Sequence, residues 1–193
     1  MDELSNEERY FLEQDQRQRA KWRAELEAKA EAATKHQALA DQVGVDNEQI
    51  VRRIAELGFN AETASVLHLM PLIAVAWADD SVSSREREAI LTAARAHGIE
   101  PGTEAATLLA SLLEQRPKED VLDQILEVIK DVLAARDMHP ASIVDACLNV
   151  ADASGGFLGF GNRISDEEKA QIEKIAADLN VDSDHKVARR LDL

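Results

Sequence analysis

Acidic and hydroxyl side chains gather in two short segments of this chain, and their oxygen atoms are the chemistry that the sequence offers most plainly. The first segment spans residues 79–88 and the second spans residues 152–168. Carboxylate and hydroxyl oxygens are hard ligands, which suit Ca²⁺ or Mg²⁺ better than a soft metal. The residues that we predict to hold such a divalent cation are Asp79, Asp80, Glu86, Asp152 and Glu168.

Each segment also contains a Ser-x-x-Glu sequence, from Ser83 to Glu86 and from Ser165 to Glu168. This spacing is typical of a capping box, in which the serine accepts a hydrogen bond from an amide three residues later and the glutamate reaches back to the serine amide. Helix capping therefore explains these serines and glutamates without any ligand.

The adjacent acids Asp79 and Asp80 need a separate explanation, because they follow an apolar helix, whose C-terminal dipole disfavours negative charge. An EF-hand loop does not explain the position of these two acids. Counted from Asp79, Ser84 stands at the sixth position, where that loop needs glycine, and Ile90 stands at the twelfth, where it needs glutamate. A cation site of another kind and simple helix capping both stay open.

The two acidic segments belong to a longer pattern that the chain contains twice. With an offset of 82 residues, the serines and glutamates of the two boxes align, and Ile90 aligns with Ile172. In each copy an apolar helix leads into the acidic turn, and an amphipathic helix follows the box. The sequence therefore predicts a bundle with an internal helix-pair repeat.

The composition predicts an all-α protein, since Ala, Glu and Leu are abundant and the chain has only 8 Gly and 4 Pro. We expect Asp46 to cap the first bundle helix and Pro71 to kink the second. The helices expected in the bundle span residues 47–57, 61–78, 84–97, 104–115, 118–135, 140–153, 166–179 and 184–191.

Residues 1–43 are predicted to form a long helical arm or short coiled coil, and residues 44–193 the bundle. The segment 5–42 lacks Gly and Pro, which favours one long helix. Phe11, Trp22 and Leu26 can share one stripe, but heptads do not persist. We expect this helix to serve as a docking arm or to join copies of the chain into a homo-oligomer.

The net charge of −15 restricts the class of partner. Such a surface repels nucleic-acid phosphates and anionic lipids, whereas basic proteins and cations are compatible with it. The apolar stretch 64–78 is shorter than a membrane span of about 20 residues. No signal peptide is visible, so we expect a cytoplasmic protein that neither binds nucleic acid nor inserts into a membrane. Cys147, the only cysteine, is expected to be buried.

The second copy of the repeat carries an insert, GGFLGFGNR, that the first copy lacks. It lacks the Lys-Ser/Thr of a phosphate-binding loop. Its large apolar residues, Phe157, Leu158 and Phe160, would either fold over the bundle as a lid or form a contact patch for a protein partner.

The segment ADDSVSSRE at residues 78–86 follows an apolar helix, and ISDEE at residues 164–168 repeats part of it. This arrangement resembles the tellurite-resistance TerB-like family over about residues 60–181. The usual turn of that family is Ala-Asp-Gly, so Asp80 stands where glycine is expected. Aspartate tolerates a positive φ angle better than most residues do.

The resemblance implies an all-helical bundle with an intracellular, non-enzymatic role in stress or tellurite resistance and with metal binding at its acidic positions. The residues themselves offer no convergent acid, base and nucleophile, so we do not expect an enzyme. We predict a binding or scaffold module that holds Ca²⁺ or Mg²⁺ at its acidic turns. The alternative is a metal-free protein–protein adaptor that uses its acidic face or the loop at residues 157–160.

Overall fold

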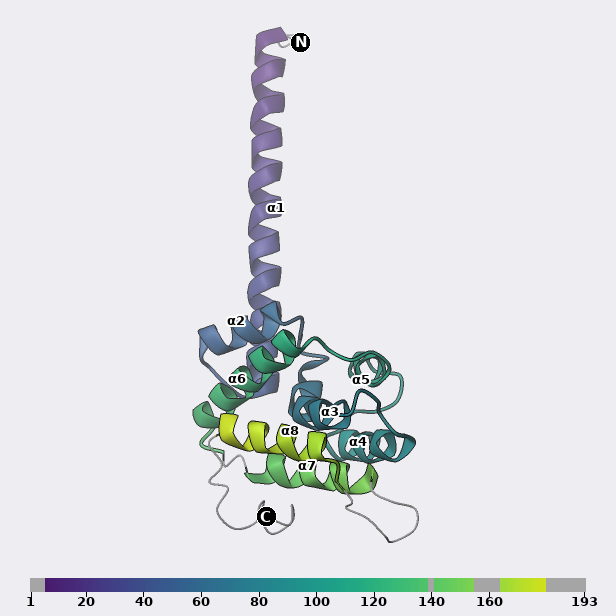
Figure 1. Cartoon of the computed structure of the whole chain (residues 1–193). Coiled ribbons are helices and arrows are strands. Elements are labelled where there is room, and N and C mark those ends of the chain that lie inside the picture. The colour runs from purple at the N-terminus through teal and green to yellow at the C-terminus, as the bar shows by residue number, and fades with distance from the viewer. Residues whose placement is uncertain (1–5, 139–140, 155–163, 180–193) are drawn as a thin grey trace. The chain divides into compact units, whose positions relative to one another are not determined.

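The computed structural model describes residues 6–138, 141–154 and 164–179, and within them the chain is helical and has no strand (Figure 1). The predicted all-α class is therefore confirmed. The elements are α1 (Asn6–Val43), α2 (Glu48–Glu56), the 3₁₀ helix η1 (Ala64–Leu69), α3 (Met70–Ala76), α4 (Ser84–Ala96), α5 (Glu104–Glu114), α6 (Glu119–Ala135), α7 (Ala141–Ser154) and α8 (Asp166–Asp178).

The chain divides into two compact units, residues 1–38 and residues 39–193. We call the helical part of the first unit, residues 6–38, the arm, and the second unit the bundle. Helix α1 crosses the division, and its last residues bury Leu39, Ala40 and Val43 in the core of the bundle. The bundle thus includes the last turn of the helix that the sequence assigned to the arm.

The two helix pairs of the sequence repeat lie at the centre of the bundle. They correspond to α3 with α4 and to α7 with α8, and Figure 1 shows these four helices gathered together. The apolar helices α3 and α7 contact each other. Each amphipathic helix also packs on the apolar helix of the other copy, because α4 contacts α7 and α8 contacts α3. Each copy of the repeat therefore packs against the other, and both contribute to one core.

The equivalent residues Ile90 and Ile172 are both fully buried in that core. Complete burial of a side chain of this size contributes roughly 1.5–3 kcal/mol. Cys147 on α7 is also fully buried, as predicted, and burial raises the pKa of its thiol. The core thus draws equally on both copies of the repeat.

The expected single helix over residues 61–78 is wrong. The chain forms the 3₁₀ helix η1 and then starts a new helix, α3, in which Pro71 occupies the first turn. A proline has no amide hydrogen, but the amides of a first helical turn have no intrahelical partner in any case. Pro71 therefore marks the start of a helix and does not kink the middle of one.

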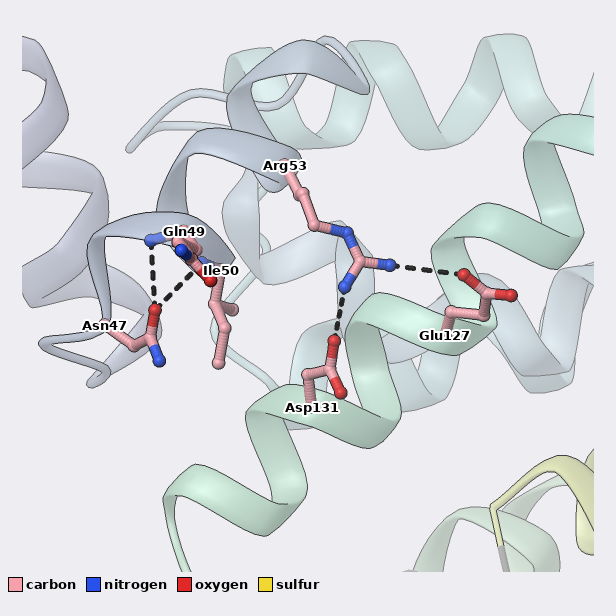
Figure 2. A network of polar contacts seen from close by, with 6 residues as sticks. All are labelled: Asn47, Gln49, Ile50, Arg53, Glu127 and Asp131. Atoms are coloured by element: carbon pink, nitrogen blue, oxygen red, sulfur yellow. Dashed lines mark hydrogen bonds and ion pairs between the residues drawn. The ribbon is translucent and has the colours of Figure 1, made fainter.

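The cap of α2 is Asn47, not Asp46 as expected. The Oδ1 atom of Asn47 accepts hydrogen bonds from the amides of Gln49 at 3.0 Å and Ile50 at 3.3 Å (Figure 2). Aspartate and asparagine both cap helices well, so residue type alone could not decide between these two neighbouring positions. The expected helix over residues 184–191 lies outside the described residues.

Within the part of the chain that the structure describes, no helix combines the length and the apolar character needed to cross a bilayer. Helix α1 is long enough at 38 residues, but it is rich in charged side chains.

Candidate functional site

The two predicted capping boxes form with matching geometry. At the start of α4, the Ser83 amide donates to Glu86 Oε2 at 2.7 Å, and the Glu86 amide donates to Ser83 Oγ at 3.2 Å. At the start of α8, the corresponding distances between Ser165 and Glu168 are 2.6 Å and 3.1 Å. The capping interpretation of these four residues is confirmed.

The two box glutamates are unusual because they are buried. Glu86 and Glu168 are each only 3% exposed, and among the residues with described burial Thr63 is the one other polar residue in this class. Acidic side chains are rarely buried unless they are paired. Here the hydrogen bond from the serine amide and the positive end of the helix dipole compensate part of the cost.

The fold brings the acids of the two repeats into electrostatic contact. Burial raises the pKa of Glu86 above its ordinary value, the hydrogen bonds with Ser83 oppose this, and the negative charges of Glu168 and Asp79 raise the pKa further. Two of the other predicted cation ligands, Asp79 and Glu168, therefore act on Glu86. Residues 82 positions apart in the sequence interact because the helix pairs α3–α4 and α7–α8 pack against each other.

Asp79 and Asp80 have different partners. Asp79 Oδ1 accepts hydrogen bonds from the Ser81 amide at 3.1 Å and from the Ser81 hydroxyl at 3.3 Å. Asp80 forms an ion pair with Arg116, which lies between α5 and α6. The pair explains the placement of Asp80 after an apolar helix, since its charge is balanced by a guanidinium distant in sequence. Sequence reasoning missed Arg116.

Asp80 adopts a left-handed backbone conformation, with a φ angle of 66°. Non-glycine residues seldom occupy this region, although aspartate does so more readily than most. A glycine at this position would adopt the same conformation without strain. The backbone thus takes the form that an Ala-Asp-Gly turn would allow.

A metal site is not formed by the predicted ligands whose side chains are described. Among the residues that the structure describes, no group of three or more His, Cys, Asp or Glu side chains is arranged to hold a metal ion. Asp152 lies near the end of α7, and its side chain is outside the described set. The predicted contact residues Phe157, Leu158 and Phe160 lie outside the described residues altogether.

A second polar cluster joins α2 to α6 (Figure 2). Arg53 pairs with Asp131 and, at 3.3 Å, with Glu127. Beside it lies a shallow groove of about 160 Å³, lined by Arg53, Glu56, Leu57, Gln124 and Val128. Arg53 contacts two carboxylates of α6 and so links α2 to α6, which is a structural role. No sequence signal pointed to this cluster, because its members are 74 and 78 residues apart.

The arm is the region with the most exposed apolar surface among the described residues. Phe11 is 68% exposed and Trp22 is 57% exposed. The other large apolar side chains of the arm that are at least half exposed are Tyr10, Leu12 and Leu26. A soluble protein rarely leaves several large apolar side chains exposed on one element unless they meet another molecule.

Comparisons of the chain with known protein families, with curated proteins and with solved structures find no match.

Proposed function

We propose that this chain is a TerB-like binding or scaffold module without catalytic activity, and that its arm meets a protein partner. The observation that carries the proposal is the exposure of Phe11 and Trp22 on a helix of otherwise polar character. Aromatic residues, above all Trp and Tyr, contribute much of the binding energy at protein interfaces. An aromatic side chain gains this energy only when a partner removes it from water.

The bundle contains both copies of the repeat. Its core is shared between the two repeats, and the charge of the buried Glu168 contributes to the raised pKa of the buried Glu86. The resemblance of residues 78–86 to the TerB-like turn supports a role in stress or tellurite resistance, and the positive φ angle of Asp80 is compatible with that turn.

A pull-down with the tagged full-length chain tests the proposal. We expect Phe11→Ser/Trp22→Ser to lose the bound protein, and the control Tyr10→Ser to retain it, because Tyr10 lies on a different face of the same helix. Equal recovery of the bound protein with the wild type and with both variants would contradict a role for the arm. In that case Phe157→Ser/Phe160→Ser tests the alternative adaptor surface.

Cation binding is a second candidate function, supported by the negative charges of Asp79 and Glu168 that act on the buried Glu86. A divalent cation would reduce the repulsion among these carboxylates. Calorimetry with Ca²⁺, Mg²⁺ and Zn²⁺ tests it on the wild type and on Asp79→Ala/Asp80→Ala. Binding heat that this variant abolishes would support the site, and the absence of heat with every ion would reject it.

A further inference from the structure

We infer that the arm pairs with the arm of a second copy of this chain in antiparallel orientation, with Phe11 of one copy opposite Trp22 of the other. The inference rests on the proposed function, because it assigns an occupant to the same aromatic surface. Such a contact is symmetric, since each copy contributes one Phe11 and one Trp22 to two equivalent layers.

The spacing of the aromatic residues places them on one face. Eleven residues complete about three turns of an α-helix, so Phe11 and Trp22 point in directions that differ by only about 20°. Leu26 follows one turn after Trp22 and extends the same stripe. Tyr10 lies about 100° away from Phe11 around the helix, so it stands outside the stripe.

The charges of the arm select a second copy as the occupant. Residues 6–15 carry four acidic residues and one basic residue, a net charge of −3. Residues 17–26 carry four basic residues and one acidic residue, a net charge of +3. The arm therefore contains two adjacent segments of equal and opposite charge, which complement each other between two copies.

These charges also select the antiparallel orientation. When two arms pair antiparallel about a centre between residues 16 and 17, residues 17–26 of each copy, with a net charge of +3, face residues 7–16 of the other, with a net charge of −3. In this register the numbers of two facing residues add to 33, as those of residues 16 and 17 do. Phe11 therefore lies opposite Trp22. Parallel pairing would instead put like charges opposite each other, which is unfavourable.

Ion pairs within the arm do not use up its charges. Three of them link residues one turn apart, all with side chains that are more than half exposed: Arg17–Glu13 and Arg19–Asp15 join the two segments, and Lys21–Glu25 lies within the second. Exposed pairs of this kind contribute only about 0.3–0.5 kcal/mol each. They stabilise the helix and leave its charges available to a partner.

Sedimentation of the purified full-length chain over a range of concentrations tests the pairing. We expect a species with twice the 21.2 kDa mass of one chain. Phe11→Ser/Trp22→Ser should raise the dissociation constant about tenfold or more, whereas Tyr10→Ser should leave it nearly unchanged. A chain that stays monomeric at all concentrations overturns the inference, as does a dimer equally stable in all three forms.

Distances between spin labels test the orientation. Labels are placed on Gln16→Cys or, separately, on Glu27→Cys, while buried Cys147 stays unlabelled. Antiparallel pairing offsets the two labels along the helix axis by about 2 Å at residue 16 and about 32 Å at residue 27. Equal distances at the two positions would indicate parallel arms and overturn the inference.

Charge reversal separates pairing from helix stability. Arg17→Glu/Arg19→Glu/Arg23→Glu changes the second segment from +3 to −3, and Glu7→Lys/Glu8→Lys/Glu13→Lys changes the first from −3 to +3. Each variant alone should be monomeric, and an equal mixture should form a heterodimer. A mixture that stays monomeric overturns the inference.

The proposed function and the inference can fail separately. A wild-type chain that remains monomeric, but loses a different protein when Phe11 and Trp22 are replaced, keeps the proposed function and overturns the inference. A dimer that forms through the arm supports both.

Discussion

Helix α6 and the arm use their apolar residues in opposite ways. Within its 17 residues, α6 buries Leu122, Ile125, Leu126, Val128, Ile129, Val132 and Leu133. The arm is longer, yet its large apolar side chains with described burial are all at least half exposed. Helix α6 thus buries its large apolar side chains within one chain, whereas the arm leaves its own exposed to solvent, which is the basis of the pairing proposed above.

The largest expected difference between the two regions concerns the free energy of unfolding. Ile172→Ala should lower it by about 2–5 kcal/mol, because the change leaves a cavity in the shared core. Leu26→Ala on the arm should change it by less than about 0.5 kcal/mol in dilute protein. Urea unfolding measures both, and comparable losses would mean that the arm packs within its own chain.

The next effect should come from the two capping boxes. Ser83→Ala and Ser165→Ala should each cost about 1 kcal/mol, since each removes the acceptor for one helix-end amide. Ser111→Ala on an exposed position of α5 is the control and should cost nothing or stabilise slightly. Two equal losses would support equivalent roles for the repeats, and a loss at only one box would contradict it.

A smaller, pH-dependent effect is expected at Glu86. Its folded-state pKa is raised, chiefly by burial and further by Glu168 and Asp79, so its favourable contribution is fully present below the unfolded-state pKa. That contribution is lost as the pH rises through the folded-state pKa. Glu86→Gln removes this titration, so its stability relative to wild type should improve between pH 4 and pH 7.

Thermal unfolding at several pH values measures this effect. Glu88→Gln, on the exposed side of the same helix, is the matched control. A relative stability of Glu86→Gln that is constant with pH, or that falls as the pH rises, would contradict the raised pKa of Glu86.

The smallest effect should follow the loss of the exposed ion pair between Asp80 and Arg116. Arg116→Ala should cost no more than about 1 kcal/mol, because solvent screens the pair, and the cost should shrink in high salt. Chemical unfolding at low and high ionic strength measures it. A larger loss that salt does not change would instead indicate that Arg116 contributes through packing.

The sequence predicted best the features that depend on neighbours within one turn. Both capping boxes formed because their hydrogen bonds join residues three apart. The kink at Pro71 was predicted wrongly, since proline at a first helical turn and proline in a helix give similar local patterns.

The contacts between distant residues could not be predicted in this way. Arg116 reaches Asp80 across 36 residues, and Arg53 reaches α6 across more than 70. The influence of Glu168 on Glu86 likewise depends on how the helix pairs α3–α4 and α7–α8 pack on each other. The repeat suggested that the two turns could combine their carboxylates, but only the fold shows which acids influence one another and which are already paired.

Hydrogen exchange at increasing concentrations of the purified chain tests the central contrast most directly. If the bundle folds without a partner and the arm pairs with the arm of a second copy, backbone amides over residues 9–26 should exchange more slowly as the concentration rises. Amides of α3 and α7 should exchange at the same rate throughout. Exchange of the arm that does not depend on concentration, with the bundle equally unaffected, would contradict the pairing of arms between copies.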